Sequence, residues 1–358
     1  MRRPTLQMAQ WASKSFGRRA FSNPVTVPRH LLSISDLTPA ELTSLVLKAS
    51  RHKSAVKTAW SAGEIPKALS GTLGGRTVAM MFSKRSTRTR VSTEAAVALM
   101  GGHPMFLGKD DIQLGVNESL LDTSRVISSM TSCMVARVGP HSDVVGLAEH
   151  SSVPVINALS DDFHPLQIIA DFLTIHETFP ERVPKADSLG LEGLKVAWIG
   201  DSNNVLFDLA TACIKLGVDI SIASPAGYGI PSVMKDVILS GRAGAARPGT
   251  LAETTVPEEA IKNADILVTD TWVSMGQEAE AKKKLAAFAG YQITNDLAQR
   301  GGAKADWKFM HCLPRHPEEV ADEVFYSPRS LVFPEAENRL WAAVAALEGF
   351  VVNKGKLL

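Results

Sequence analysis

The stretch 77–102, TVAMMFSKRSTRTRVSTEAAVALMGG, is the clearest indication of fold class in this chain. Its first six residues, TVAMMF, form a short apolar run typical of a buried β-strand, and STEAAVALMGG (92–102) is typical of a helix that ends at glycine. The same alternation of strand and helix recurs along the chain. Further strands are predicted at CMVARV (133–138), VPVINAL (153–159), KVAWIG (195–200), DISIAS (219–224), ADILVTD (264–270) and KFMHCLP (308–314).

Strands that alternate with helices predict an α/β fold with parallel sheets covered by helices on both faces. The segment 176–194, HETFPERVPKADSLGLEGL, is polar and interrupted by proline and glycine, so we expect it to join two doubly wound domains. One domain is expected at 36–175, completed by a C-terminal helix at 335–358, and the other at 190–330. An active site is expected in the cleft between them.

The composition excludes several classes of function. The chain has 38 Lys and Arg against 37 Asp and Glu, and its formal net charge of +1 provides no basic face for nucleic acid. The apolar run LWAAVAALEGFVV (340–352) is too short to cross a membrane and carries Glu348, so we interpret it as a buried helix. Cys133, Cys213 and Cys312 form no CxxC pair, which argues against a disulfide framework or a structural zinc site.

The first 35 residues have the composition of a mitochondrial transit peptide. They hold six Lys and Arg residues, several serines and no acidic residue. This composition predicts import into the mitochondrial matrix, with cleavage near RRAFS (18–22), and a disordered basic tail is the alternative. Thr38 and Glu41 then form a capping box with proline at the first helical position, which predicts the start of a long helix.

SKRSTRTR (83–90) places four basic side chains within eight positions between a predicted strand and a predicted helix. With Ser86 or Thr87 as the N-cap, backbone N–H groups and the helix dipole point toward the same place as the arginines. Such a helix start binds phosphate groups, and an inward-facing Arg88 can hold phosphate oxygens with its planar guanidinium. A solvated helix start with an ordinary cap is the alternative.

The element STRTR (86–90) resembles the carbamoyl-phosphate loop of the aspartate and ornithine carbamoyltransferase family. HPLQ (164–167), DTWVSMGQ (270–277) and HCLPR (311–315) are similar to further family motifs in order and spacing, and the last two resemble the ornithine branch. The resemblance implies an enzyme of arginine biosynthesis or the urea cycle. It would transfer the carbamoyl group of carbamoyl phosphate to the δ-amine of L-ornithine, giving L-citrulline and phosphate, without a cofactor or a metal.

The resemblance also implies how carbamoyl phosphate is held. This mixed anhydride needs its phosphate bound and its carbonyl polarised. Arg137 and His164 would point at the carbonyl oxygen, while Gln167 and the backbone carbonyl of Leu313 would bind the carbamoyl NH₂ group. The complete implied set of carbamoyl-phosphate contacts is Ser86, Thr87, Arg88, Thr89, Gln113, Arg137, His164, Gln167, Cys312, Leu313 and Arg339.

Two members of this set carry further expectations. Arg339 is expected at the start of the last helix, closing over the phosphate, and its alternative is a surface ion pair with Glu335 or Glu337. Gln113, in DDIQLGVNES (110–119), lies on the loop that completes the phosphate site of a neighbouring subunit in the family. The resemblance therefore implies a homotrimer, and an ordinary surface turn is the alternative.

Ornithine brings a carboxylate, an α-ammonium group and a δ-ammonium group that must lose its proton before attack. By resemblance, Asp270 and Ser274 hold the α-ammonium group. Asn204 and the backbone of Met275 hold the carboxylate. Cys312 lies near the ornithine side chain and, with Asp270, favours the neutral δ-amine, and it is not expected to be a nucleophile. The implied catalytic residues are Cys312, Asp270, Arg137 and His164.

Other functions remain open at this point. A dinucleotide-dependent oxidoreductase could have a similar α/β architecture, but no GxGxxG follows any predicted strand. A regulatory protein could keep the fold and bind arginase, as some fungal members of the family do. Branches that use aspartate, putrescine or an acylated ornithine are disfavoured by the S-M-G loop.

Overall fold

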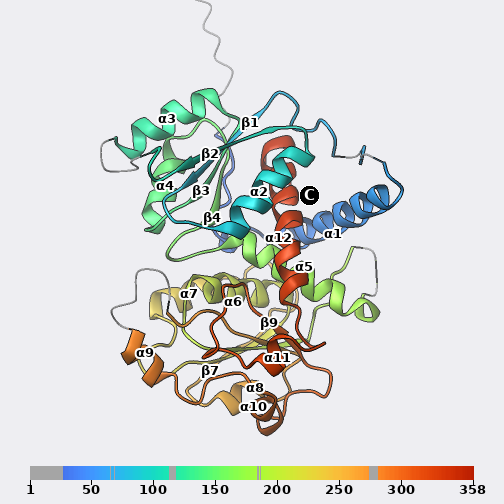
Figure 1. The fold of residues 1–358 in the computed structure, drawn as a ribbon, viewed down its shortest axis with the longest axis vertical. Coiled ribbons are helices and arrows are strands. Elements are labelled where there is room, and N and C mark those ends of the chain that lie inside the picture. Colours follow the sequence, from blue (N-terminus) through green and yellow to red (C-terminus); the bar gives the residue numbers. More distant parts are fainter. Residues whose placement is uncertain are drawn as a thin grey trace, which may run out of the picture.

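The computed structural model describes residues 27–64, 66–67, 69–112, 118–183, 185, 187–273 and 281–358. Two β-sheets, each packed against helices, form the upper and lower parts of the molecule in Figure 1. Their strand orders are β2-β1-β3-β4 and β7-β6-β5-β8-β9. Each paired strand runs parallel to its neighbour in both sheets. The predicted α/β fold with two doubly wound parallel sheets is confirmed.

Each strand predicted from an apolar run is present, and two edge strands were missed. The missed strands, β2 and β7, have exposed or half-exposed residues that interrupt the apolar pattern, as edge strands commonly do. The first sheet consists of β1 (Thr77–Phe82), β2 (His103–Gly108), β3 (Cys133–Arg137) and β4 (Val155–Leu159), and the second of β5 (Lys195–Ile199), β6 (Asp219–Ala223), β7 (Leu251–Thr254), β8 (Ile266–Val268) and β9 (Lys308–Met310).

Helices cover both faces of the first sheet. One face carries α1, α2, α5 and α12, which pack against one another, and the other carries the pair α3 and α4. Figure 1 shows α12 in red beside α2 and α5, although it comes from the end of the chain. These helices are α1 (Pro39–Ser61), α2 (Thr87–Leu99), α3 (Leu120–Met130), α4 (His141–His150), α5 (Pro165–Thr178) and α12 (Val332–Leu347).

The second sheet is covered in the same way. α6 and α7 pack on one face, while α8 and α10 contribute to a separate core on the other. The remaining helices of the described residues are α6 (Asn204–Leu216), α7 (Ser232–Ser240), α8 (Pro257–Ile261), α9 (Ala281–Ala287), α10 (Asn295–Arg300), α11 (Asp322–Phe325), the short η1 (Ile34–Asp36) and η2 (Pro180–Arg182), and the π-helical turn η4 (Glu348–Val352).

Strand β1 explains why TVAMMF is apolar at successive positions. Val78 and Met80 pack into the core beneath α1, α2, α5 and α12, whereas Ala79 and Met81 pack into the core beneath α3 and α4. A strand buried on both faces cannot alternate apolar and polar residues. The uninterrupted run therefore indicates a central parallel strand.

The N-terminal part of the described chain is packed into the first sheet. The Leu31 N–H donates to the Val155 carbonyl at 2.9 Å, and the Asn157 N–H donates to the Leu31 carbonyl at 2.8 Å. Leu31 and Ile34 are fully buried. A leader that extended to residue 35 would include these packed residues, so the folded part of the chain begins before Leu31.

The C-terminal helix differs from its predicted position. It begins at Val332, ends as an α-helix at Leu347 and continues into the π-helical turn η4. Arg339 lies in the middle of α12 rather than at its start, and it is 3% exposed. Both the expected start position and the alternative of a surface ion pair for Arg339 are therefore wrong. Among the described residues, no helix combines the length and apolar character needed to span a bilayer.

Candidate active site

A cavity of about 1060 Å³ lies between the two sheets. Its walls are the turn after β1, the start of α5 and the segments that follow β5, β8 and β9. These walls lie at the carboxyl ends of parallel strands, where α/β folds bind ligands. The predicted site residues that line this cavity are Ser86, Thr87, Arg88, Thr89, Arg137, His164, Gln167, Asn204, Asp270, Cys312, Leu313 and Arg339.

Three predicted site residues cannot be placed. Gln113, Ser274 and Met275 lie outside the residues that the structure describes. The expected subunit contact at Gln113 and the expected ornithine loop at 274–275 stay predictions.

The turn after β1 has the expected geometry of a helix start. Ser86 is the N-cap of α2, because its Oγ accepts a hydrogen bond from the Thr89 N–H at 3.2 Å. Arg88 donates to the backbone carbonyl of Leu313, which belongs to the segment after β9 on the other side of the cavity. Arg90 is exposed and pairs with a glutamate one helical turn later at 2.9 Å. Arg88 therefore faces the cavity, while Arg90 faces solvent.

Positive charge converges on the buried end of the cavity. The pKa of Arg137 and that of Arg339 are lowered to about 10, mainly by burial, and the charge of the nearby Arg88 contributes to both shifts. Burial also holds the pKa of His164 well below its usual range, with a further contribution from these arginines. Arg137 Nε and His164 Nδ1 are buried without a hydrogen-bond partner among the described residues. An unpaired guanidinium N–H beside an unpaired imidazole nitrogen suits a site for an anion with further polar groups.

A hydrogen-bonded chain joins three predicted residues. Arg339 donates to Gln167 Oε1 and, through its other terminal nitrogen, to Thr89 Oγ1 at 3.1 Å. These residues come from α12, α5 and α2, which pack together on one face of the first sheet. The packing of three helices therefore sets the position of the guanidinium.

The backbone of His164 is held by a carboxyl group of α6, a helix that covers the second sheet. Its N–H donates to Asp208 Oδ2 at 2.8 Å, while Asp208 Oδ1 accepts from Ser33 Oγ at 3.0 Å and from the Ile34 N–H at 2.9 Å. Burial raises the pKa of Asp208 to about 7 despite these donors. Asp208 belongs to α6, so one carboxyl group fixes both the start of α5 and η1 against the second half of the molecule.

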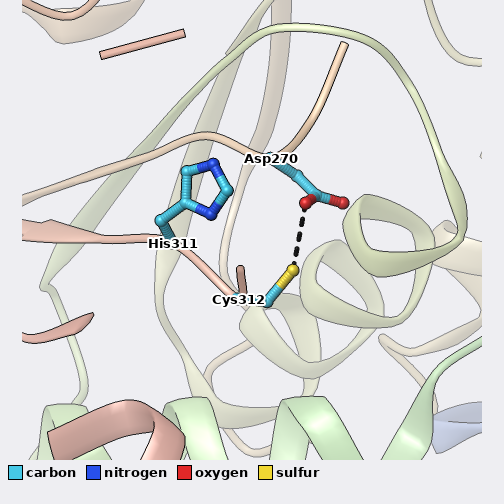
Figure 2. Close-up of side chains that lie close together, drawn as sticks. All are labelled: Asp270, His311 and Cys312. Atoms are coloured by element: carbon cyan, nitrogen blue, oxygen red, sulfur yellow. Dashed lines mark hydrogen bonds between the residues drawn. The ribbon is translucent and has the colours of Figure 1, made fainter. Parts of the chain in front are cut away.

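Asp270 dominates the opposite side of the cavity. Cys312 Sγ donates to Asp270 Oδ1 at 3.0 Å, as Figure 2 shows, and Asn203 Nδ2 donates to Asp270 Oδ2 at 2.8 Å. Burial, followed by the charge of Asp270, raises the pKa of the Cys312 thiol well above its usual range. A thiol in such surroundings stays protonated, which argues against a thiolate nucleophile.

The cluster in Figure 2 also has the composition of a metal site. Asp270, His311 and Cys312 each offer one ligand atom, and these atoms lie within 4.8 Å of one another. His311 Nε2, however, is hydrogen-bonded to Glu319 at 3.0 Å, and His311 Nδ1 accepts from the Leu313 N–H at 2.9 Å. Because both ring nitrogens are engaged and the thiol is bonded to Asp270, these residues do not fit a metal ion.

The segment after β5 contributes Asn204, whose Nδ2 donates to the Ser160 carbonyl at 2.6 Å. The neighbouring Asp201 pairs with Lys284 of α9 at 2.6 Å. A run of three lysines, such as 282–284, usually forms a solvated helix face, but Lys284 is only 5% exposed. The ion pair instead anchors α9 beside the cavity.

Sequence reasoning missed several residues that hold the predicted ones in place. They are side chains that accept or donate hydrogen bonds in the cavity wall or behind it, namely Asn203 in the wall and Asp171, Asp208 and Glu335 behind it. A usable signal exists for two of them, because Asp171 and Asp208 are charged residues flanked by apolar residues within α5 and α6. The sequence does not indicate which donors they meet.

Comparison with known proteins agrees with this geometry. The model of the aspartate/ornithine carbamoyltransferase carbamoyl-P binding domain matches residues 29–177, and that of the Asp/Orn binding domain matches residues 192–349. A mitochondrial ornithine carbamoyltransferase of Aspergillus terreus is 68% identical over 330 residues, which are 92% of this chain and 90% of that protein.

Solved structures give the same result. The crystal structure of a mitochondrial ornithine carbamoyltransferase from Coccidioides immitis is 66% identical and superposes with a TM-score of 0.85, covering 92% of this chain and 100% of that chain. The ornithine carbamoyltransferase from Pyrococcus furiosus is 40% identical, with a TM-score of 0.80 over 91% of this chain and 98% of that chain. Both halves of the sequence and the fold that they form establish that the chain belongs to the aspartate/ornithine carbamoyltransferase family.

Proposed function

We propose that this protein transfers the carbamoyl group of carbamoyl phosphate to the δ-amine of L-ornithine, giving L-citrulline and phosphate in arginine biosynthesis. The observation that carries the proposal is the cavity itself. Arginines, hydroxyls and a helix N-terminus converge on one side, and the Asp270–Cys312 pair faces them from the other. An anionic substrate and a cationic substrate can therefore meet in one site.

The phosphate belongs at the start of α2. The Ser86 and Thr87 hydroxyls and the backbone N–H groups of this turn supply short hydrogen bonds, and the helix dipole adds partial positive charge. Arg88 and Arg339 would hold the phosphate oxygens with planar guanidinium groups. Arg339 donates a hydrogen bond to Thr89 Oγ1 at 3.1 Å, so these two side chains would contact the same anion.

The carbonyl group of the substrate belongs beside Arg137 and His164. Because its pKa is held well below the usual range, His164 is a neutral imidazole near pH 7 and acts as a hydrogen-bond donor rather than as a charge. Together with Arg137 it would stabilise the negative charge that develops on the carbonyl oxygen. Gln167 Oε1 and the Leu313 carbonyl would accept from the carbamoyl NH₂, with Leu313 exchanging its bond from Arg88.

The amine belongs beside Asp270 and Cys312. The Asp270 carboxylate would hold the α-ammonium group, with Asn204 near the carboxylate and with Ser274 and Met275 completing this side. A protonated Cys312 next to Asp270 favours an uncharged δ-amine. The amine nitrogen then attacks the carbonyl carbon, a C–N bond forms, the C–O bond to phosphate breaks, and the proton lost from nitrogen leaves with the phosphate or solvent.

The domains and the cellular setting follow from the same assignment. We assign carbamoyl phosphate to the domain at 36–175 with the C-terminal helix at 335–358, and ornithine to the domain at 190–330. A leader that ends before Arg29 and directs the chain to the mitochondrial matrix fits both the basic N-terminal composition and the packing of Leu31. We also propose a role in the urea cycle and a homotrimer in which Gln113 completes the phosphate site of a neighbouring subunit. A contact with arginase stays a prediction, which co-sedimentation of the two proteins would test.

Citrulline formation tests the reaction directly. Protein that begins at residue 27 is supplied with carbamoyl phosphate and L-ornithine, and aspartate and putrescine serve as parallel acceptors. Product with ornithine alone is the expected result. Absence of product from a folded protein that still binds carbamoyl phosphate would contradict the proposal and favour the regulatory function.

A further inference from the structure

Two buried carboxyl groups lie directly behind Gln167. Asp171, one turn later in α5, and Glu335, in the first turn of α12, are 3% and 2% exposed. Gln167 Nε2 donates to Asp171 Oδ1 at 2.7 Å and to Glu335 Oε1 at 3.0 Å. Both hydrogens of the Gln167 amide are therefore engaged by carboxyl oxygens.

This arrangement determines where the Gln167 oxygen points. With its NH₂ group held by the two carboxyls, Gln167 presents Oε1 to Arg339, which donates to it. A rotated amide would place an NH₂ group against the guanidinium and an oxygen against two carboxyl groups. Hydrogen bonding therefore permits one orientation of the amide.

The two carboxyl groups also bond to each other, so one of them carries a proton. Burial is the main reason why the pKa of Asp171 is raised to about 7 and that of Glu335 well above its usual range. With one shared proton, the pair has a single negative charge, which balances Arg339 beside it. The second oxygen of Glu335 accepts from the His311 N–H at 3.0 Å, so it also contacts the segment after β9.

We propose that Asp171 and Glu335 are positioning residues that fix the Gln167 amide with its oxygen toward the carbamoyl group. This inference rests on the proposed function. Neither carboxyl group contacts the substrate, because both act through Gln167. Glu335 additionally ties α12 to the segment that carries Cys312 and Leu313.

The network predicts unequal effects of two similar substitutions. In Asp171→Asn, the amide oxygen still accepts from Gln167, and the amide NH₂ replaces the shared proton toward Glu335. In Glu335→Gln, one acceptor oxygen becomes an NH₂ group that must face either Gln167 Nε2 or the His311 N–H, and both are donors. Both substitutions remove one carboxyl group, so an effect of charge alone would be equal.

The test measures citrulline formation by the full chain, with each substrate varied at saturating levels of the other. Asp171→Asn is expected to keep the KM for carbamoyl phosphate within about twofold, whereas Asp171→Leu and Glu335→Gln raise it about tenfold or more. Asp171→Leu should leave the KM for ornithine within about twofold. Glu337→Gln is the matched control, because this neighbour in α12 is half-exposed and pairs with Lys57 at 2.6 Å.

A normal KM for carbamoyl phosphate in Asp171→Leu would overturn the inference, and so would equal impairment of the Asn and Leu variants. If circular dichroism shows that Asp171→Leu does not fold, the comparison between Asp171→Asn and Glu335→Gln becomes the test. Equal KM values for carbamoyl phosphate in these two variants would overturn the inference. Absence of citrulline from the unsubstituted chain would instead overturn the proposed function together with this inference.

Discussion

Replacement of Arg88 with alanine is expected to weaken carbamoyl-phosphate binding strongly and to leave the free energy of unfolding nearly unchanged. Burial lowers the pKa of Arg137, Arg339 and His164, and the Arg88 charge lowers each of them further. Removal of Arg88 therefore relieves repulsion within the cavity. The same change removes the hydrogen bond to the Leu313 carbonyl, which acts in the opposite direction.

The expected magnitudes differ for stability and binding. A hydrogen bond from a charged donor contributes about 1.5–3 kcal/mol, so partial compensation by relieved repulsion leaves a net change in unfolding free energy of about 1 kcal/mol. A bound phosphate loses two charge-assisted bonds from the Arg88 fork, which at this strength are together worth about 3–6 kcal/mol. At about 1.4 kcal/mol for each factor of ten, affinity should fall about a hundredfold to ten-thousandfold.

Two measurements separate these effects. Isothermal titration with carbamoyl phosphate gives the affinity, and urea denaturation gives the free energy of unfolding. Arg90→Ala is the matched control, because Arg90 lies in the same helix turn but is exposed and pairs with Glu94 at 2.9 Å. Unchanged affinity in Arg88→Ala, or a loss of stability large enough to explain the weaker binding, would refute the assignment of Arg88 to the phosphate.

Three further predictions concern other parts of the molecule. Asp270→Asn should raise the KM for ornithine about tenfold to a hundredfold and leave that for carbamoyl phosphate within about twofold, as measured by steady-state kinetics. Cys213→Ser should lower the free energy of unfolding by about 1–3 kcal/mol in urea denaturation, because it buries a hydroxyl in an apolar core, without changing kcat. Arg29 donates to Glu41 at 2.9 Å and lowers the pKa of this carboxyl group to about 2. The ion pair therefore stabilises the fold at pH values above 4.5, the pKa of the group in the unfolded chain, and this stabilisation is lost as pH falls toward 2. The Tm deficit of Glu41→Gln should accordingly be largest near neutral pH and shrink over that interval.

The fold was predictable where burial leaves a simple pattern. Central strands such as β1 and β5 are buried on both faces, so each appears in the sequence as an apolar run. The edge strands β2 and β7 lack that pattern, because partly exposed residues interrupt them and β2 also contains Pro104. Their presence follows from pairing with a neighbouring strand, which local sequence does not encode.

The cavity wall was predictable to a similar extent. Residues that follow a strand and begin a helix, such as Ser86 and Arg88, combine a local capping pattern with a chemical type suited to an anion. Arg339 lies in no such local pattern, and its predicted position at the start of the last helix was wrong. It reaches the cavity because α12 returns from the end of the chain to pack against α2 and α5.

The least predictable residues are the carboxyl groups that hold the wall in place. Asp208 joins α6 to His164, and Glu335 joins α12 to His311, so each links a helix to a backbone N–H group on another part of the chain. A charged residue flanked by apolar residues, as Asp208 is in α6, indicates that a partner must exist, because an unpaired buried charge would be too costly. It does not identify that partner, since either carboxyl group could accept from any donor that packing brings near. Side chains of the cavity wall such as Ser86 and Arg88 therefore follow from local patterns, whereas the bonds that orient the wall follow only from the packed structure.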